Sequence, residues 1–162
     1  MQNSQTGIKP YEGKFREQML SVWERSVLAT HDFLSPADFI SIKEIVHTID
    51  FSAFDVFCLM KEQKVIGFVG VAEKKVEMLF LDPLFFGQGL GKKLMAFALT
   101  ELQADKVDVN EQNLNSVNFY KKLGFETYER TEKDDQGKQY PLLRMKFLRD
   151  STLRKFSSDG VY

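Results

Sequence analysis

The sequence predicts an α/β fold in which a mixed sheet carries helices on both faces. Strand-like runs occupy residues 55–82, two helix-like segments precede them, and strands alternate with helices after them. The expected order of elements is β-α-α-β-β-β-α-β-α-β-β. A chain of 162 residues fits one domain, which we place at residues 1–148. Residues 149–162 are expected to form a polar C-terminal tail.

The N-terminal part is expected to be mostly helical. A short strand is predicted at residues 8–11. Apolar residues recur at helical spacing over residues 15–29, which predicts the first helix. Ser35 followed by Pro36 is typical of a helix start, so a second helix is expected there. Its apolar face should contain Phe39, Ile42, Ile45, Val46 and Ile49.

The remaining elements follow from turn signals. The charged segments EQK and AEKK separate three apolar runs within residues 55–82 and predict an antiparallel meander. The glycine-rich GQGLG opens a helix, and KVDV is a short strand. Asn113 suits a helix N-cap and Gly124 suits the end of the same helix. The segments FETYERTEK and PLLRMKFL are expected to be strands of a hairpin that turns at DDQGK.

Composition excludes several classes of protein. The 22 basic and 23 acidic side chains give a net charge of −1, which argues against nucleic-acid binding and a polybasic membrane anchor. No apolar stretch is long enough to span a membrane, and no signal peptide is visible. One cysteine, Cys58, and two histidines cannot form an internal disulfide or a zinc-finger site. We expect a cytoplasmic protein, monomeric or homodimeric, that uses no metal.

The glycine-rich loop is the strongest functional signal. Gly87, Gly89 and Gly91 lie where a strand passes into a helix, and glycine lets a ligand approach the backbone closely. The free N–H groups and the dipole at the helix start favour an anion such as a phosphate. Lys92 and Lys93 add positive charge. The spacing fits neither a Rossmann fingerprint nor a Walker A loop. The alternative interpretation is a glycine turn that only starts a helix.

The stretch FLDPLFFGQGLGKKL resembles the acyl-CoA-binding signature of the GCN5-related N-acetyltransferase (GNAT) family. A second stretch, DVNEQNLNSVNFYKKLGF, resembles a later region of that family, in which an Asn starts a helix and a Tyr follows. The order of elements also matches the family's acyl-CoA N-acyltransferase fold. The segments ERSVLATHDFLS, VNEQN, FYKKLGF and DDQGKQYPLL resemble a bacterial branch of the family, the YjaB-like acetyltransferases, which act on protein lysines.

This resemblance implies that acetyl-CoA is the co-substrate and assigns its contacts. Leu79, Phe80 and Leu81 would hold the pantetheine arm and the thioester, and Asn113 would bind the pantetheine or a structural water. Tyr120 would be the general acid that protonates the leaving thiolate and would also contact the coenzyme. The alternative for Tyr120 is a core aromatic, since Phe119 and Leu123 share its helix. Phe86 replaces the signature's leading Arg or Gln, which should weaken the pyrophosphate contact. The pyrophosphate would lie against Gly87, Gln88, Gly89, Leu90, Gly91 and Lys92.

The sequence indicates the general base and the acceptor-binding residues less clearly than the coenzyme contacts. His31 lies between the first two helices, where the family receives its acceptor, and is either a base, a positioning residue or a structural histidine. Asp32, Asp108, Glu111 or a water chain are alternatives. The acceptor wall is expected to include Trp23, Ser26, Thr30, His31 and Phe33, although Trp23 also fits a core position.

Three functions remain open at this point. The first is direct transfer of an acetyl group from acetyl-CoA to a primary amine, with a protein lysine as acceptor. The second is the same transfer to a small amine such as a polyamine or a drug. The third is a non-catalytic acyl-CoA-binding protein that contacts a partner.

Overall fold

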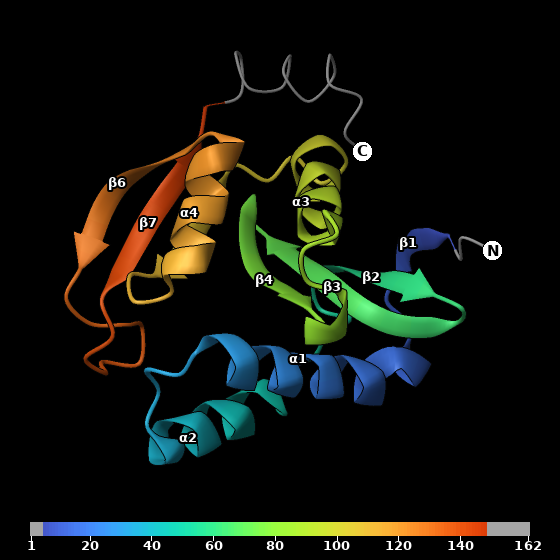
Figure 1. The fold of residues 1–162 in the computed structure, drawn as a ribbon, viewed down its shortest axis with the longest axis horizontal. Coiled ribbons are helices and arrows are strands. Elements are labelled where there is room, and N and C mark those ends of the chain that lie inside the picture. The colour runs from blue at the N-terminus through green and yellow to red at the C-terminus, as the bar shows by residue number, and fades with distance from the viewer. Residues whose placement is uncertain (1–4, 149–162) are drawn as a thin grey trace.

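One seven-stranded sheet runs through the molecule in the order β1-β2-β3-β4-β5-β7-β6 (Figure 1). The structure is a computed structural model that describes residues 5–148, so the predicted tail at 149–162 lies outside it. The strands are β1 (Thr6–Pro10), β2 (Asp55–Lys61), β3 (Lys64–Ala72), β4 (Lys75–Leu81), β5 (Lys106–Asn110), β6 (Phe125–Thr131) and β7 (Leu142–Phe147). The helices are α1 (Arg16–Thr30), α2 (Pro36–Val46), α3 (Leu90–Thr100) and α4 (Leu114–Leu123), with 3-10 turns η1 (Gly13–Phe15) and η2 (Pro83–Phe85). The predicted fold class and order of elements are confirmed.

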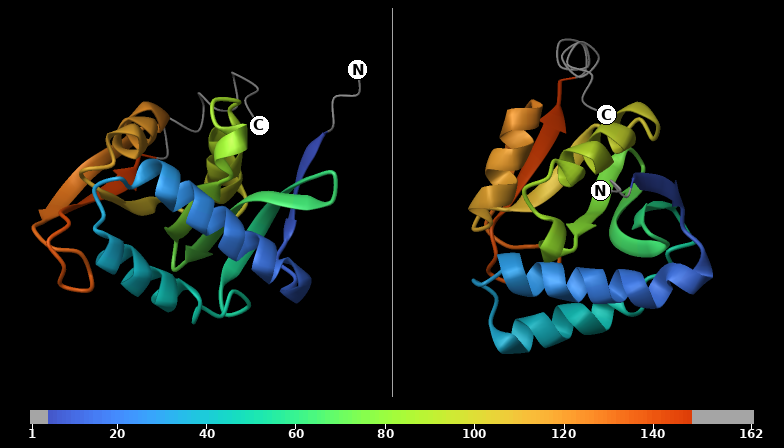
Figure 2. Two further views of the ribbon diagram at one scale, coloured as in Figure 1. Left: turned by 60° about the horizontal axis from the view of Figure 1, so that its bottom comes forward. Right: turned by 45° about the vertical axis from the view of Figure 1, so that its right-hand side comes forward.

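Helices cover both faces of the sheet, as predicted. Figures 1 and 2 show α1 and α2 together on one side of the strands, and α3 and α4 on the other. Each side has its own apolar core. Met19, Trp23 and Phe51 belong to the core under α1 and α2, whereas Leu94, Leu99 and Met145 belong to the core under α3 and α4.

Local signals predicted the helix starts correctly. The Ser35 side chain accepts a hydrogen bond from Asp38 N at 3.1 Å, and the Asn113 side chain accepts one from Ser116 N at 3.3 Å. Each bond satisfies a backbone donor that has no partner within its helix. Gly124 ends α4 in a left-handed conformation, with φ 109°.

The predicted apolar face of α2 is wrong at two positions. The helix ends at Val46, so Ile49 lies beyond it. Ile45 is 41% exposed. It follows Phe39 by six residues, which is less than two turns at about 3.6 residues per turn. Because Phe39 faces the stacked ring of Trp23 on α1, Ile45 falls to the side of the helix that faces away from the core.

The sheet separates in its middle. All neighbouring strands pair antiparallel except β4 and β5, which run parallel and pair only through Lys75–Lys106 and Val76–Val107. The register of β4 against β3 shifts between Val76 and Met78, so Glu77 is an extra, bulged residue at the point of separation. Beyond it, β4 continues along β3 while its other edge leaves β5. The candidate functional site lies in the space that opens where β4 and β5 separate.

Candidate active site

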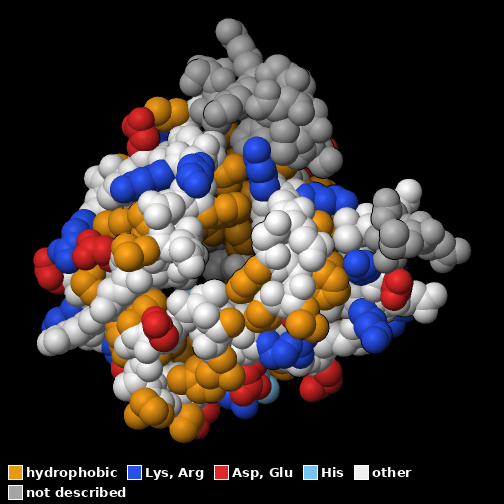
Figure 3. All heavy atoms as spheres, in the orientation of Figure 1, with side chains coloured by type: hydrophobic (Ala, Val, Ile, Leu, Met, Phe, Trp, Pro, Cys, Tyr) orange, Lys and Arg blue, Asp and Glu red, His pale blue; other side chains and the backbone are white. Residues whose placement is uncertain are grey.

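Two cavities that share lining residues lie where β4 and β5 separate. The main cavity has a volume of about 570 Å³, and the inner cavity, between the strands, of about 120 Å³. Figure 3 shows a hollow at the centre of this face, with hydrophobic side chains on its walls and basic side chains around its upper rim. Both cavities are lined by His31, Leu79, Phe80, Asn113 and Ser116.

Most of the residues predicted for the site line one of these cavities. The main cavity adds Ser26, Thr30, Leu81, Phe86, Gly87, Gly89, Leu90, Gly91, Lys92, Asn115, Phe119, Lys122 and Leu123. The inner cavity adds Val76, Glu77, Met78, Val107, Asp108, Val109, Asn110 and Tyr120. The fold therefore brings together residues from α1, β4, the glycine loop, β5 and α4.

The glycine loop has the geometry of an anion cradle. Gly87 and Gly89 have φ of 78° and 77°, a region that favours glycine. Gly89 is also the N-cap of α3. A Cβ at either position would meet no atom within 4 Å, so it would extend into open space beside the helix start. The first N–H groups of α3 and the positive end of its dipole are thus open to a phosphate.

The two lysines of this helix start have different surroundings. Lys92 lines the main cavity. The Lys93 ammonium instead donates to the carbonyl of Thr6 at 3.1 Å and to its hydroxyl at 2.8 Å, which joins α3 to β1. Gln88 is not among the residues that line the cavity. Lys122 on α4 does line it. From the sequence, the pair Lys121 and Lys122 was compatible with either a solvated helix face or neutralisation of a nearby coenzyme phosphate.

A buried carboxylate fixes the turn before the glycine loop. Asp82 is 6% exposed. It accepts hydrogen bonds from Leu84 N at 3.1 Å and from the Arg25 guanidinium at 2.6 Å. Its own N–H donates to the Ile66 carbonyl at 2.7 Å. Asp82 thereby joins α1, β3 and η2. In the sequence, Asp82 followed by Pro83 marks the end of the third apolar run, and Asp before Pro is also a typical capping signal at a helix start.

Tyr120 lies between two aromatic rings at the inner cavity. It is 7% exposed and packs edge-on against Phe119 and Phe125, with ring centroids 5.1 and 5.5 Å away. Burial raises the pKa of its phenol well above the ordinary value of 10. The hydroxyl therefore stays protonated at any working pH and can donate a hydrogen bond.

His31 lines both cavities from the end of α1. Its backbone N–H donates to the Val27 carbonyl, which makes it the C-cap of the helix. Burial lowers the pKa of its imidazole below 6.5, and the nearby Asp32 partly opposes this. The ring is therefore neutral at physiological pH and has a nitrogen lone pair, as a base requires.

Two other candidate bases are held by cations. Asp108 forms ion pairs with Lys75 and Arg144, each at 2.7 Å. Glu111 is paired with Arg130, whose hydrogen bond lowers the pKa of the Glu111 carboxyl. The Glu111 carboxylate is therefore a weaker base, and one oxygen of Asp108 is occupied by two cations. Glu77, which the sequence analysis did not select, lines the inner cavity from the β4 bulge. Because the bulge depends on the pairing of β4 with β3, the sequence alone does not mark Glu77.

The predicted acceptor residues separate into two groups. Ser26, Thr30 and His31 line the main cavity. Trp23 is 3% exposed and stacks on Phe39 in the core. Phe33 also lies outside the cavity lining, but its ring contacts His31 and Tyr140, with centroids 5.2 and 6.1 Å away.

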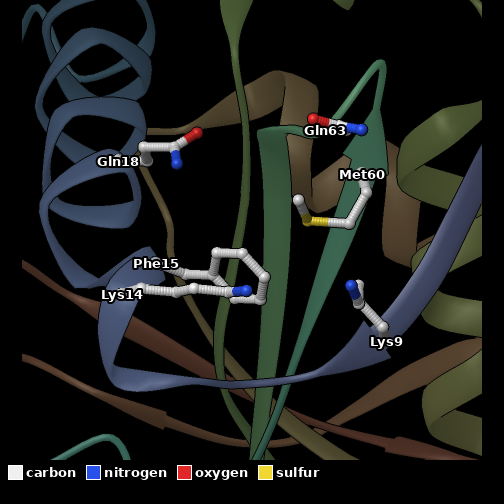
Figure 4. A pocket seen from close by; sticks show the side chains of 6 residues that line it. All are labelled: Lys9, Lys14, Phe15, Gln18, Met60 and Gln63. Carbon is white, nitrogen blue, oxygen red and sulfur yellow. The ribbon is translucent and has the colours of Figure 1, made fainter.

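A separate cavity of about 600 Å³ lies beside β1 and the start of α1 (Figure 4). None of the residues predicted for the site lines it. Its two ammonium groups, on Lys9 and Lys14, are 3.9 and 3.7 Å from the Glu12 carboxylate. The lining residues are Lys9, Lys14, Phe15, Gln18, Met60 and Gln63.

A membrane-spanning helix and a metal-binding group are both absent from the described residues. Between residues 5 and 148, no helix is both long and apolar enough to cross a membrane. In the same part of the chain, no three His, Cys, Asp or Glu side chains are grouped so that they could hold a metal ion.

Comparison with known proteins gives consistent matches. The model of the acetyltransferase (GNAT) domain matches residues 28–147. The peptidyl-lysine N-acetyltransferase YjaB of Salmonella typhimurium is 41% identical over 129 residues, covering 80% of this chain and 89% of that protein. The solution structure of apo-form YjaB from Escherichia coli has a TM-score of 0.82 at 34% identity, covering 89% of this chain and 98% of the other. The structure of yncA from Salmonella typhimurium with its cofactor acetyl-CoA has a TM-score of 0.65 at 17% identity, covering 91% and 96%, and shows likeness of fold alone.

Proposed function

The chain belongs to the GNAT acetyltransferase family, and on this basis we propose that it transfers the acetyl group of acetyl-CoA directly to the amine of a protein lysine. The family resemblance predicted from the sequence is confirmed, and the chain is an N-acetyltransferase. The lysine acceptor is supported by the name of a relative that is 41% identical over 80% of the chain. The observation that carries the proposal is the cleft between β4 and β5, where the glycine loop, His31 and Tyr120 line two cavities that share five residues.

The donor side of the cleft fits acetyl-CoA. The open space at Gly87 and Gly89 and the start of α3 suit a pyrophosphate. Lys92 and Lys122 add positive charge at the main cavity. The edge of residues 79–81 that faces away from β3 borders the same cavity, so its backbone groups can bind an amide-bearing arm as a neighbouring strand would. The yncA structure with acetyl-CoA supports this choice of donor at the level of the fold.

The acceptor amine must be neutral when it attacks the thioester carbonyl. A lysine ammonium has a pKa of about 10.4, so it must lose a proton first. We assign this proton to His31, which is neutral at physiological pH for the reason given above. Asp108 and Glu111 are less suitable because Lys75, Arg144 and Arg130 neutralise them.

The departing thiolate needs a proton donor. Tyr120 lines the inner cavity beside residues 79 and 80, and its buried phenol remains protonated. We assign it as the general acid. A backbone N–H of the segment 79–81 would stabilise the negative charge that develops on the carbonyl oxygen.

The acceptor class is tested with four acceptors at one acetyl-CoA concentration. These are a lysine peptide with a blocked N-terminus, the same peptide with arginine in place of lysine, a polyamine and an aminoglycoside. We expect thiol release with the lysine peptide and none with the arginine peptide. If the polyamine or the aminoglycoside has the higher kcat/KM, the acceptor is a small amine and the lysine proposal is wrong.

Replacing Phe86 with arginine should tighten acetyl-CoA binding. Phe86 lines the main cavity next to Gly87 and is 43% exposed, so a guanidinium there can reach the coenzyme's phosphates. One charge-assisted hydrogen bond corresponds to a roughly tenfold lower Kd. Isothermal titration calorimetry measures it.

The variant Leu84→Arg tests whether any added positive charge near the loop tightens acetyl-CoA binding. Leu84 is two residues away and 83% exposed, and it does not line the cavity. We expect this variant to change Kd little. Equal tightening in both variants, or none in Phe86→Arg, would show that Phe86 does not replace a phosphate ligand.

We place the reaction in the cytoplasm. Cys58 is buried against the Met19 sulfur at 3.6 Å, and burial raises the pKa of its thiol to about 12. A single unreactive thiol without a disulfide suits a reducing compartment.

A further inference from the structure

One hydroxyl joins the end of α1 to the His31 ring. Thr30 Oγ1 lies 2.7 Å from His31 Nδ1 and donates to the Ser26 carbonyl at 2.8 Å. Ser26 is 6% exposed, so its carbonyl lies in the well-packed last turns of the helix. The three groups form a short chain from the helix backbone to the imidazole.

The number of protons in this chain determines the tautomer of the ring. A threonine hydroxyl has one proton to donate and accepts through its lone pairs. The Ser26 carbonyl can only accept, so both contacts of the Thr30 hydroxyl are hydrogen bonds only if Nδ1 carries a proton and donates it. In the neutral ring, the lone pair is then on Nε2.

We infer that Thr30 is a positioning residue that holds neutral His31 in the tautomer with its lone pair on Nε2, ready to take the acceptor's proton. This inference rests on the proposed function in one respect, namely that His31 is the base. The Phe33 ring, 5.2 Å from the imidazole, restricts the ring on another side. A base fixed in this way needs no reorientation before the transfer.

The same contacts also suit the protonated ring. Nδ1–H donates to Thr30 in both charge states, and the bond is stronger when the ring is charged. The C-terminal end of α1 also favours a cation. The other titratable groups around the ring are Asp32 on its own loop, Lys92 and Lys122 at the main cavity and, at the inner cavity, Glu77, Asp108 and Tyr120. Of these, Asp108 is neutralised by Lys75 and Arg144.

The tautomer can be observed directly in the full-length protein. Imidazole ¹⁵N chemical shifts separate a protonated nitrogen from one with a lone pair, and this chain has only two histidines. The variant His47→Gln assigns the remaining signals to His31. We expect the Nδ1–H tautomer above the pKa of His31. The Nε2–H tautomer in the unmodified protein would overturn the inference.

Two variants of Thr30 test the functional consequence. Thr30→Val removes the hydroxyl and keeps the branched shape, whereas Thr30→Ser keeps the hydroxyl. Loss of a hydrogen bond to a charged ring should lower kcat about tenfold in the valine variant. It should change KM for acetyl-CoA little.

The pH profile separates positioning from packing. His31 acts when neutral, so kcat/KM should fall as pH decreases through its pKa, which lies below 6.5. Without the Thr30 acceptor, the imidazolium is less stable and its pKa is lower still. The acid limb of the valine variant should therefore move to lower pH, and the serine variant should keep it in place. An acid limb that stays in place in Thr30→Val would contradict the inference.

Failure of the inference and failure of the proposed function give different results. If His31→Gln keeps full turnover, the base assignment is wrong whatever the tautomer is. If His31→Gln loses turnover but Thr30→Val keeps the Nδ1–H tautomer and the acid limb, Thr30 is not the positioning residue. In that case acetyl transfer through His31 still stands.

Discussion

Replacing Tyr120 with phenylalanine is expected to lower kcat about 100-fold, the lower end of what general acids contribute. The hydroxyl is lost from the inner cavity, so the thiolate must depart without a donor. Acetyl-CoA affinity and the midpoint of thermal unfolding should change little, because the contacts with Phe119 and Phe125 involve the ring and not the hydroxyl.

The raised pKa of Tyr120 explains why the lower end of the range is expected. A more weakly acidic phenol donates a hydrogen bond to the sulfur more readily than it gives up its proton completely. Its contribution is thus partly electrostatic. Thiol release under single-turnover conditions measures the loss.

Tyr128→Phe is the matched control. It makes the same change on β6, at a side chain that is 55% exposed and lines neither cavity. It should keep the unmodified rate. If Tyr120→Phe also keeps it, the phenol is not the acid, and water or the acceptor must protonate the thiolate.

Replacing Gly89 with alanine is expected to raise the Kd for acetyl-CoA roughly 10- to 100-fold. The residue is the N-cap of α3 with φ 77°, and an added Cβ would extend into open space at the anion cradle. The methyl group would keep the pyrophosphate away from the first N–H groups of the helix. Calorimetric titration with acetyl-CoA measures the change.

Gly137→Ala separates this effect from backbone strain. Gly137 also has φ 77° and open space around its Cβ, but it lies in the β6–β7 connection and lines neither cavity. Each variant should lose about 1 kcal/mol of unfolding free energy, because alanine disfavours this conformation. Only Gly89→Ala should weaken binding. Equal weakening in both would mean that the glycine loop binds no phosphate.

Local sequence signals predicted the elements well because the physics behind them is local. The starts of α2 and α4 follow from Ser35 and Asn113, whose side chains satisfy backbone donors within three residues. The loop at Gly87 and Gly89 follows from conformations that other residues disfavour. Such features need no knowledge of the rest of the chain.

The interior of the site could not be predicted in this way. The separation of β4 from β5 depends on which distant segments pair, and nothing in either strand marks it. The contact between α2 and the β6–β7 connection is also long-range. The Asp38 carboxylate accepts hydrogen bonds from the Tyr140 hydroxyl and, at 2.8 Å, from the Lys138 ammonium, which lowers the pKa of the Asp38 carboxyl to about 2. About a hundred residues separate the partners.

His31 shows what sequence position can predict about a site residue and what it cannot. Its position between two helices suggested contact with the acceptor, but its burial and its bond to Thr30 depend on the folded chain. Trp23 is a residue for which the sequence left two interpretations and the structure selects one. Its helical spacing was compatible with either the acceptor wall or the core, and stacking on Phe39 places it in the core.

The most direct test of acetyl transfer to lysine is the stoichiometry of the reaction. The protein is mixed with acetyl-CoA and the lysine peptide, free thiol is counted by a colorimetric reagent, and acetylated peptide is counted by mass spectrometry. We expect one thiol for each acetylated lysine, and much slower formation of both with Tyr120→Phe although acetyl-CoA still binds. Binding of acetyl-CoA without thiol release for any amine acceptor would contradict it and would identify the cleft as a binding site alone.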